Sequence, residues 1–278
     1  MADARPITFL SDYGYEGEFA GVCRAVIAQI APGAPVIDLT HGIGRQGIRH
    51  GALALANALP FSPPGVHLAV VDPGVGTERR AVAVRAGSAG QPADDRLLVG
   101  PDTGLLGPAL EALGGATEAV DLGRSPFRLE PVSATFHGRD LFAPVAAHLA
   151  LGANLSEAGE PIDPGSLVAL ELPRPRIEAD RIVAHALHAD RFGNVALDLG
   201  PEDLGDGPLA PGSRLEVRAP DGRFEATWAR TFADVRRGDL LLYEDSTRTL
   251  ALSVNGGSAA GLLDLDPDDE VELRPLRA

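Results

Sequence analysis

Apolar positions in the first half of the chain follow two spacings. Short apolar runs, typical of buried strands, alternate with longer stretches in which apolar residues recur every three or four positions, typical of helices that cover a sheet. This alternation predicts an α/β fold with a mainly parallel, doubly wound sheet. The predicted strands are Ile7–Leu10, Val36–Leu39, Val66–Val71, Ala81–Arg85 and Leu97–Val99, and the predicted helices are Phe19–Ile30, Ile48–Leu59, Leu105–Leu113 and Arg139–Leu151.

The second half changes to short β-rich runs, which predict a small C-terminal β-barrel domain. Pro220-Asp221-Gly222 predicts a hairpin turn between two of the runs. Several prolines without a clear period favour a linker at 161–175, between an N-terminal α/β domain (1–160) and the barrel domain (176–278). The predicted strands are Arg181–His188, Asn194–Leu197, Arg214–Ala219, Arg223–Thr231, Leu240–Tyr243, Thr249–Val254 and Glu270–Leu273.

Composition narrows the class of protein. The 278 residues are 45% hydrophobic, and no apolar run approaches the roughly 18 residues that a membrane span needs. The N-terminus shows no basic region followed by an apolar stretch, so we expect a cytoplasmic protein without membrane partners. The single cysteine, Cys23, excludes an internal disulfide and a cysteine-built metal cluster, and its place in a helical pattern predicts a core residue.

The charge balance excludes further classes. The net charge is −15, and such a surface repels phosphate backbones, so we expect no nucleic-acid partner. Every basic residue except the histidines is an arginine. Without lysine there is no phosphate-loop lysine, no Schiff base and no lysine general base, which leaves acid–base chemistry to Asp, Glu, His or Tyr.

The segment Val66–Arg80, VHLAVVDPGVGTERR, is the most informative stretch of the chain. A buried strand that ends at a carboxylate, Asp72, and continues into a glycine-rich loop is how open α/β sheets present site residues. The alternative is that Asp72 only begins a turn and the two arginines are solvated.

Other polar residues are predicted to meet Asp72 at the same edge of the sheet. Asp12 and His41 also follow predicted strands, and His137 precedes a predicted helix, whose N-terminus adds positive potential. A structural histidine at 137, and a role for Asp140 limited to the helix dipole, remain alternatives. Asp12, His41, Asp72 and His137 are also suitable ligand types for a two-metal hydrolase, although no pair has a recognised ligand spacing.

Two loops of the second half combine polar and glycine residues. The loop 190–194, Asp-Arg-Phe-Gly-Asn, offers an acid, an aromatic face and an amide, a set able to hold a purine or an amino-acid zwitterion. The stretch 255–259, Asn-Gly-Gly-Ser-Ala, offers backbone groups to a flat polar ring. The alternative for both is an ordinary turn.

In these segments and others, the chain resembles the S-adenosyl-L-methionine (SAM) hydroxide adenosyltransferase family, which is related to the adenosyl-fluoride and adenosyl-chloride synthases. The resemblance covers nearly the whole chain. It rests on seven motifs in order: ITFLSDYG, VIDLTHGI, VVDPGVGTERR, LLVGPDTGLL, TFHGRDLFAP, HADRFGNV and VNGGSAAGLL.

The resemblance implies hydrolysis of SAM to adenosine and methionine by water that attacks C5′, with no cofactor and no metal. It implies an N-terminal α/β domain, a C-terminal barrel, and a homotrimer whose sites lie between subunits. The characteristic Asp, Arg and His match Asp72, Arg79 and His137, with the adjacent Arg80 as the alternative arginine. The ribose-binding aspartate matches Asp12.

By the same resemblance, the methionine and adenine contacts lie in the second domain. They match a group of side chains and loop residues: Asp190, Phe192, Asn194, Phe232, Asn255, Ser258 and Ala259.

Two alternatives stay open. A halide adenosyltransferase is disfavoured by the short segment from Arg85 to Leu97, by Gly138 where the halide synthases carry a hydroxyl residue, and by the presence of His137. A non-catalytic adenosine or SAM sensor would use the same pocket without forming product.

Overall fold

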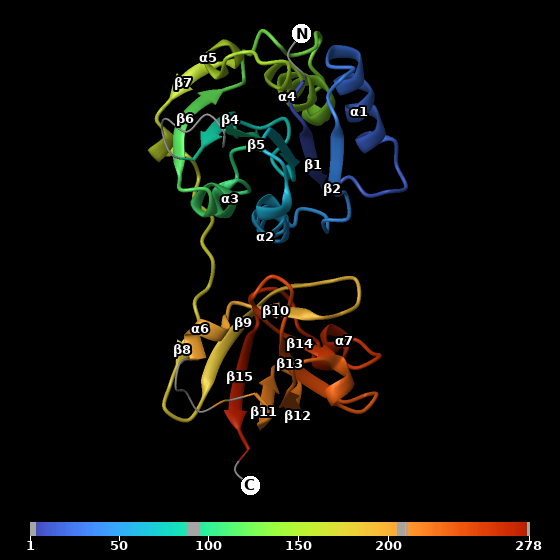
Figure 1. Ribbon diagram of the computed structural model, residues 1–278, viewed down its shortest axis with the longest axis vertical. Coiled ribbons are helices and arrows are strands. Elements are labelled where there is room, and N and C mark those ends of the chain that lie inside the picture. Colours follow the sequence, from blue (N-terminus) through green and yellow to red (C-terminus); the bar gives the residue numbers. More distant parts are fainter. Residues whose placement is uncertain (1–3, 88–94, 205–208, 210, 277–278) are drawn as a thin grey trace. The chain divides into compact units, whose positions relative to one another are not determined.

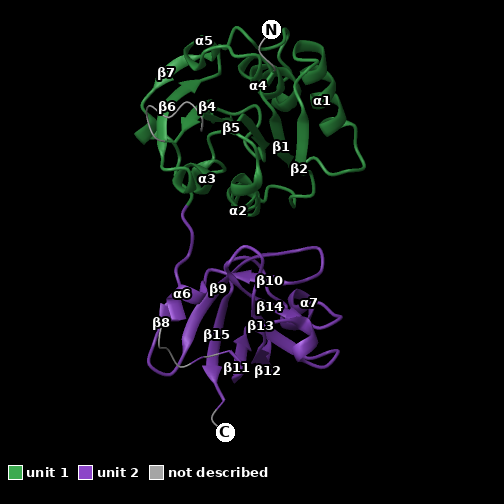
Figure 2. Ribbon diagram, viewed as in Figure 1, with its two compact units in different colours: residues 1–170 green, residues 171–278 purple. Residues whose placement is uncertain are grey.

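The structure is a computed structural model that describes residues 4–87, 95–204, 209 and 211–276. It divides into two compact units, Met1–Leu170 and Glu171–Ala278, which are coloured separately in Figure 2. The segment 161–175 spans this division. Its first residues complete the last strand of the unit 1 sheet, and Pro164–Ser166 form a 3-10 turn.

Unit 1 is built on a sheet whose strands are β1 (Ile7–Ser11), β2 (Val36–Thr40), β3 (Val66–Val70), β4 (Ala81–Ala86), β5 (Arg96–Pro101), β6 (Ala116–Asp121) and β7 (Glu160–Ile162). Among the described residues these seven strands lie in the order β2-β1-β3-β5-β4-β6-β7 (Figure 1). Pairing is parallel from β2 to β5 and antiparallel from β5 to β7. Two antiparallel steps return β6 to the direction of β5, so only β4 and β7 run the other way. The predicted mainly parallel sheet is confirmed.

Helices cover both faces of this sheet, and their bounds are α1 (Phe19–Ile30), α2 (Ile48–Ala58), α3 (Gly107–Ala112) and α4 (Ala143–Ala150). Side chains alternate between the faces along each strand. Phe9 and Leu68 pack with α1 and α4, whereas Leu10 and Ala69 pack with α2 and α3. Cys23 is a fully buried member of the first cluster, as predicted.

The core of unit 2 is a closed barrel of seven strands, which confirms the predicted C-terminal barrel. They are β9 (Ile182–Ala189), β10 (Val195–Leu197), β11 (Arg214–Ala219), β12 (Gly222–Trp228), β13 (Leu240–Glu244), β14 (Leu250–Val254) and β15 (Glu270–Pro275). In the described part of the unit, pairing of β9 with β10 closes the ring, and β8 (Arg176–Ile177) adds to β9 at its side. The turn at Pro220-Asp221 joins β11 to β12, as its sequence predicts.

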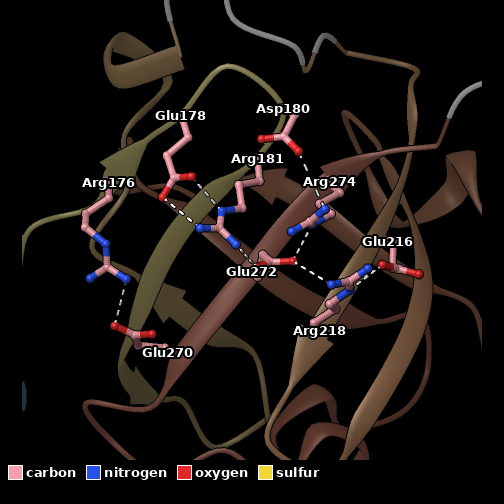
Figure 3. Close-up of polar contacts among 9 residues, drawn as sticks. All are labelled: Arg176, Glu178, Asp180, Arg181, Glu216, Arg218, Glu270, Glu272 and Arg274. Atoms are coloured by element: carbon pink, nitrogen blue, oxygen red, sulfur yellow. Dashed lines mark hydrogen bonds and ion pairs between the residues drawn. The ribbon is translucent and has the colours of Figure 1, made fainter.

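Arginine–glutamate ion pairs cover part of the outer face of this barrel (Figure 3). Glu272 lies on β15 between two buried core residues, so its side chain points outward. Its carboxylate accepts from Arg181 at 3.0 Å, from Arg218 at 3.1 Å and from Arg274. The guanidinium of Arg274 holds the pKa of Glu272 below its usual value.

The sequence did not predict several elements. Strands β6, β7 and β8 are among them, and so are three helices of four or five residues, α5 (Leu155–Ala158), α6 (Pro201–Leu204) and α7 (Ala259–Leu263). In the part of the chain that the structure describes, no helix has the length and apolar character needed to cross a membrane.

Candidate active site

The loop that follows β3 carries a paired carboxylate and guanidinium. β3 is buried along its whole length, and the loop 71–80 returns the chain to β4. Arg79 Nε donates to Asp72 Oδ1 at 2.8 Å, and Arg79 Nη2 donates to Asp72 Oδ2. The Arg79 side chain is only 10% exposed and the Asp72 side chain only 7%. A bidentate pair of this kind fixes the orientation of both groups.

Backbone sterics explain the glycines of this loop. Gly76 has φ +77°, and a Cβ there would lie 2.6 Å from the backbone oxygen of Ala134. Thr77 Oγ1 donates to the Gly74 carbonyl at 2.7 Å and closes the turn. The loop therefore packs tightly against the segment that leads to His137, which a side chain at 76 would push away.

His137 joins the pair from a distant part of the sequence. It precedes a π-helical turn, Gly138–Phe142, that continues into α4, and such turns are frequent at functional sites. Arg79 Nη2 lies 2.8 Å from His137 Nδ1. Because a guanidinium has no acceptor, Nδ1 must accept and the ring proton sits on Nε2.

The charge state of His137 follows from its surroundings. Burial, and then the neighbouring Arg79, lower the pKa of this imidazole below its usual value. A neutral ring with its proton on Nε2 offers one N–H donor away from Arg79. Asp72, Arg79 and His137 thus form one hydrogen-bonded chain, which we call the unit 1 triad.

Asp140 holds the histidine loop in place. Its carboxylate is 3% exposed and accepts from the Ser133 backbone N–H at 2.8 Å and from Arg139 Nε at 2.6 Å. These contacts lower its pKa despite burial. Asp140 therefore fixes the backbone before His137 as well as standing in the first helical turn.

Asp12 lies beside Asp72 because β1 and β3 are neighbours in parallel register, with Ser11 opposite Val70. The Gln46 backbone N–H donates to Asp12 Oδ2 at 3.4 Å. Burial raises the pKa of Asp12, and the negative charge of Asp72 adds to the rise. A half-buried carboxylate next to the triad has acceptor capacity for two hydroxyl groups.

His41, the remaining candidate from the strand ends, has structural contacts. It is 3% exposed. Ser11 Oγ lies 2.8 Å from its Nδ1, and its ring packs edge-on against Phe9 with centroids 4.7 Å apart. Among the described residues no three His, Cys, Asp or Glu side chains are grouped closely enough to hold a metal ion. The structure therefore gives no support to the two-metal alternative.

A cavity of about 340 Å³ opens beside the triad and is lined by Arg79 and His137. Arg80 also lines it, but its guanidinium is bound elsewhere. Arg80 Nε donates to Asp102 Oδ2 at 2.8 Å, and Nη1 donates to Ser166 Oγ at 3.0 Å. Of the two adjacent arginines, Arg79 is the one that contacts Asp72 and His137.

Unit 2 contains a larger pocket of about 870 Å³. Ligand pockets for small molecules commonly measure roughly 300–1,000 Å³. Five of the residues that the sequence nominated in this unit line it: Asp190, Phe192, Asn194, Phe232 and Asn255. The two rings among them are exposed, Phe192 at 62% and Phe232 at 40%.

The loop between β9 and β10 is organised by its own acid. Asp190 Oδ1 accepts from the backbone N–H groups of Phe192 at 2.8 Å and Asn194 at 2.9 Å, and Oδ2 accepts from Asn194 Nδ2 at 2.8 Å. Ser253 Oγ donates to Asn194 Oδ1. Asp190 therefore presents Phe192 and Asn194 in a fixed loop, in addition to any ligand contact of its own.

The second glycine-rich stretch of unit 2 is also held by internal bonds. Asn255 Nδ2 donates to the carbonyls of Phe232 at 2.9 Å and Val235 at 3.0 Å. Ser258 caps α7, accepting from the Gly261 N–H at 3.0 Å. Ser258 and the buried Ala259 are not among the residues that line the pocket.

Tyr243 is one of several pocket residues that the sequence analysis did not name. Tyr243 lies on β13, with its ring centroid 5.1 Å from that of Phe232. Burial raises the pKa of Tyr243 to about 12. An aromatic residue near the end of a predicted strand was the available signal, but strand aromatics usually pack in cores.

Comparison with known proteins decides the family. The N-terminal domain of the SAM hydroxide adenosyltransferase family matches residues 7–159, and its C-terminal domain matches residues 184–272. The chain belongs to this family. The resemblance inferred from the seven motifs is thereby confirmed.

Relatives support this assignment along the whole chain. A protein of Salinispora tropica named (R)-S-adenosyl-L-methionine hydrolase is 47% identical, covering 98% of this chain and 99% of its own. One of the same name from Thermus thermophilus is 38% identical over 97% and 99%. A fluorinase of Actinopolyspora mzabensis is 28% identical over 94% and 95%. A crystal structure of a conserved protein from Thermotoga maritima superposes with TM-score 0.86 at 34% identity, covering 96% and 99%.

The segment that was expected to distinguish this chain from the halide synthases is described only in part. The short segment from Arg85 to Leu97 includes residues 88–94, which are outside the described residues. Gly138 and His137 are both described. His137 belongs to the triad, and Gly138 is the residue that follows it.

Proposed function

We propose that this protein hydrolyses SAM to adenosine and L-methionine. The observation that carries the proposal is the unit 1 triad, a hydrogen-bonded Asp–Arg–His chain with a nearly buried ion pair at the sheet edge of a SAM hydroxide adenosyltransferase family member. The names of the more similar relatives agree with this activity, and the fluorinases are more distant.

The reaction is an in-line displacement at C5′. The water oxygen forms a bond to C5′, the C5′–S bond breaks, and its electron pair neutralises the sulfonium, so that methionine leaves as a thioether. The leaving group needs no protonation. The protein has to place one water molecule, stabilise its developing hydroxide character and accept its proton.

The triad supplies these groups. His137 Nε2–H and the Arg79 guanidinium donate toward the water oxygen, which stabilises negative charge there. The Asp72 carboxylate is the acceptor of the cluster, since each of its oxygens keeps a lone pair beyond the bond from Arg79. Asp12 accepts from the ribose hydroxyls and fixes the sugar for attack.

The unit 2 pocket supplies binding. Phe192 and Phe232 present exposed rings to a purine, and the Asn194 amide faces the same space. We further propose that Asp190, Asn255, Ser258 and Ala259 complete these contacts. For Ser258 and Ala259 the support is the family resemblance alone, because neither lines the pocket.

The proposal extends to assembly and requirements. We propose a cytoplasmic homotrimer in which the triad of one subunit works with the pocket of the next, and a reaction that needs neither metal nor cofactor. The family resemblance supports the trimer, the shared site and the metal-free reaction, and the cytoplasmic location is the expectation from the sequence pattern. Mixing an Arg79→Ala variant with a Phe232→Ala variant, then unfolding and refolding them together, tests the shared site. At SAM concentrations well below the wild-type KM, the activity of the mixture should exceed that of either variant alone.

Chromatography of SAM incubated with the purified protein tests the activity. We expect adenosine and methionine in equal amounts, unchanged by EDTA. Loss of turnover on chelation would restore the metal alternative. A 5′-chloro-adenosine product with added chloride would identify a halide transferase, and bound but unaltered SAM would identify a sensor.

A further inference from the structure

A tyrosine hydroxyl lies against the backbone of the residue that follows His137. Tyr13 comes directly after Asp12 in the loop that follows β1. A Cβ placed on Gly138 would fall on the Tyr13 hydroxyl oxygen and lie 2.9 Å from its Cζ. A side chain at position 138 and the hydroxyl of Tyr13 therefore exclude each other. Glycine at 138 is what admits the phenol.

Aromatic packing fixes this hydroxyl in place. The Tyr13 ring centroid lies 6.5 Å from that of Phe9, 5.8 Å from Phe19 and 5.8 Å from Phe136, and two of the three contacts are edge-on. Phe136 and Gly138 flank His137 in sequence. Tyr13 thus contacts the residues on both sides of His137, and its ring has little freedom to turn the hydroxyl elsewhere.

The phenol is neutral and lies near the triad. Burial raises the pKa of Tyr13 well above its usual value, and the charges of Asp12 and Asp72 add to the rise while that of Arg79 opposes it. A hydroxyl that keeps its proton both donates and accepts hydrogen bonds. It is therefore suited to contact water, which does the same.

The triad offers the attacking water two hydrogen-bond donors but only one acceptor. His137 Nε2–H and Arg79 are donors, so both compete for the lone pairs of the water oxygen. Its two protons need acceptors, and Asp72 is one. The Tyr13 oxygen can supply the second acceptor, because a hydroxyl oxygen accepts as well as donates.

We propose that Tyr13 positions the attacking water through its hydroxyl, which occupies the space beside His137 that a side chain at position 138 would fill. This inference rests on the proposed hydrolysis of SAM. It adds to the triad a residue from a different strand end, and it gives position 138 a defined steric role.

The Tyr13→Phe variant removes the hydroxyl and keeps the ring. We expect kcat to fall by about 10- to 100-fold, the size of one lost hydrogen bond in a transition state, with KM for SAM within about threefold of the wild type and an unchanged melting temperature. Tyr15→Phe is the matched control, because its hydroxyl bonds to Thr40 and to the His41 backbone. Its kcat should stay within about twofold.

Gly138→Ala tests the steric half of the proposal. The new methyl group should displace the Tyr13 hydroxyl and lower kcat by a similar factor. In the double variant the two losses should be less than multiplicative, because the hydroxyl is already gone and only the contact with the ring, 2.9 Å from Cζ, remains.

Three results would overturn the inference: a Tyr13→Phe kcat within twofold of the wild type, a loss confined to KM, or losses that multiply in the double variant. Measuring the wild type alongside distinguishes a failure of the proposed function from a failure of the role of Tyr13. If it forms no adenosine from SAM, the proposed function fails. If it does and Tyr13→Phe matches it, only the role of Tyr13 fails.

Discussion

The unit 1 triad and the unit 2 pocket place polar groups in opposite ways. In unit 1, a carboxylate, a guanidinium and an imidazole are bonded to one another beside a cavity of about 340 Å³, and the ion pair is almost fully buried. In unit 2, exposed aromatic rings and an amide border about 870 Å³, and the polar groups mainly organise their own loops. The first arrangement suits the activation of a small nucleophile, and the second suits the binding of a larger ligand.

This contrast separates two kinds of variant. Changes in the triad should act on turnover, because buried donors and acceptors stabilise charge that develops only in the transition state. Changes in the pocket should act on KM, because stacking and apolar contact are as strong in the ground state as in the transition state.

The largest effect is expected in the triad. Arg79→Ala should lower kcat by about 10³-fold or more while the dissociation constant for adenosine changes by less than about threefold. Steady-state kinetics and calorimetry measure the two quantities. Arg80→Ala is the matched control, since its guanidinium bonds to Asp102 and Ser166. It should mainly lower stability, and an equal loss of kcat in both variants would contradict the assignment.

A buried histidine should make unit 1 lose stability in acid, whereas unit 2 should be less affected. His67 on β3 is fully buried, and burial lowers its pKa to about 4. The unfolded state then binds more protons between about pH 6.5 and pH 4, so stability falls as the pH drops through this window. The full loss is about 3 kcal/mol. Urea unfolding of wild type and His67→Gln at pH 7 and 4.5 should show a weaker pH dependence in the variant.

The single tryptophan makes this prediction specific to one unit. Trp228 lies on β12 of unit 2 and reports barrel unfolding by fluorescence, whereas far-UV circular dichroism follows both units. At pH 4.5 we expect the dichroism transition to begin at lower urea than the fluorescence transition. Coincident transitions at pH 4.5 would show that the units do not differ in this way.

The next largest effect is expected in the unit 2 pocket. Phe232→Ala should raise KM for SAM by about 10- to 30-fold and leave kcat within about threefold, because a stacking surface is removed without touching the triad. Phe61→Ala, which removes a ring 89% exposed in unit 1, is the control and should change neither constant. A fall in kcat with KM unchanged would reverse the division of roles.

The smallest effect is expected on the barrel surface. Glu272→Gln removes the carboxylate shared by three arginines and should cost about 1 kcal/mol or less, a loss that salt reduces further. Because the pKa of Glu272 is lowered in the folded protein, its contribution is present above about pH 4.5 and disappears as the pH falls further. Thermal melts at low and high salt measure it, and a large salt-independent loss would contradict a surface role.

The sequence predicted what depends on local pattern and strand direction. Asp12 and Asp72 lie together because parallel strands end at one edge, which apolar periodicity reveals. The sequence alone could not show whether Arg79 or Arg80 contacts Asp72, because the path of the chain into β4 decides which guanidinium turns back toward that carboxylate. The cap that Ser258 provides to α7 was not predicted either, because the short helix has no clear apolar period.

Contacts between distant segments were the hardest to foresee. Tyr13 belongs to the ITFLSDYG motif, but its position against Gly138 depends on how the β1 loop packs on the turn before α4. Strand β6 was missed because Ala116–Asp121 pairs on both sides yet has exposed residues at its start, which blurs the apolar pattern.

The central claim is that water attacks C5′ of SAM. A reaction run in ¹⁸O-labelled water, with both products analysed by mass spectrometry, tests it directly. The account predicts one labelled oxygen in adenosine, at the 5′-hydroxyl, and none in methionine. Unlabelled adenosine, or label in methionine, would contradict it.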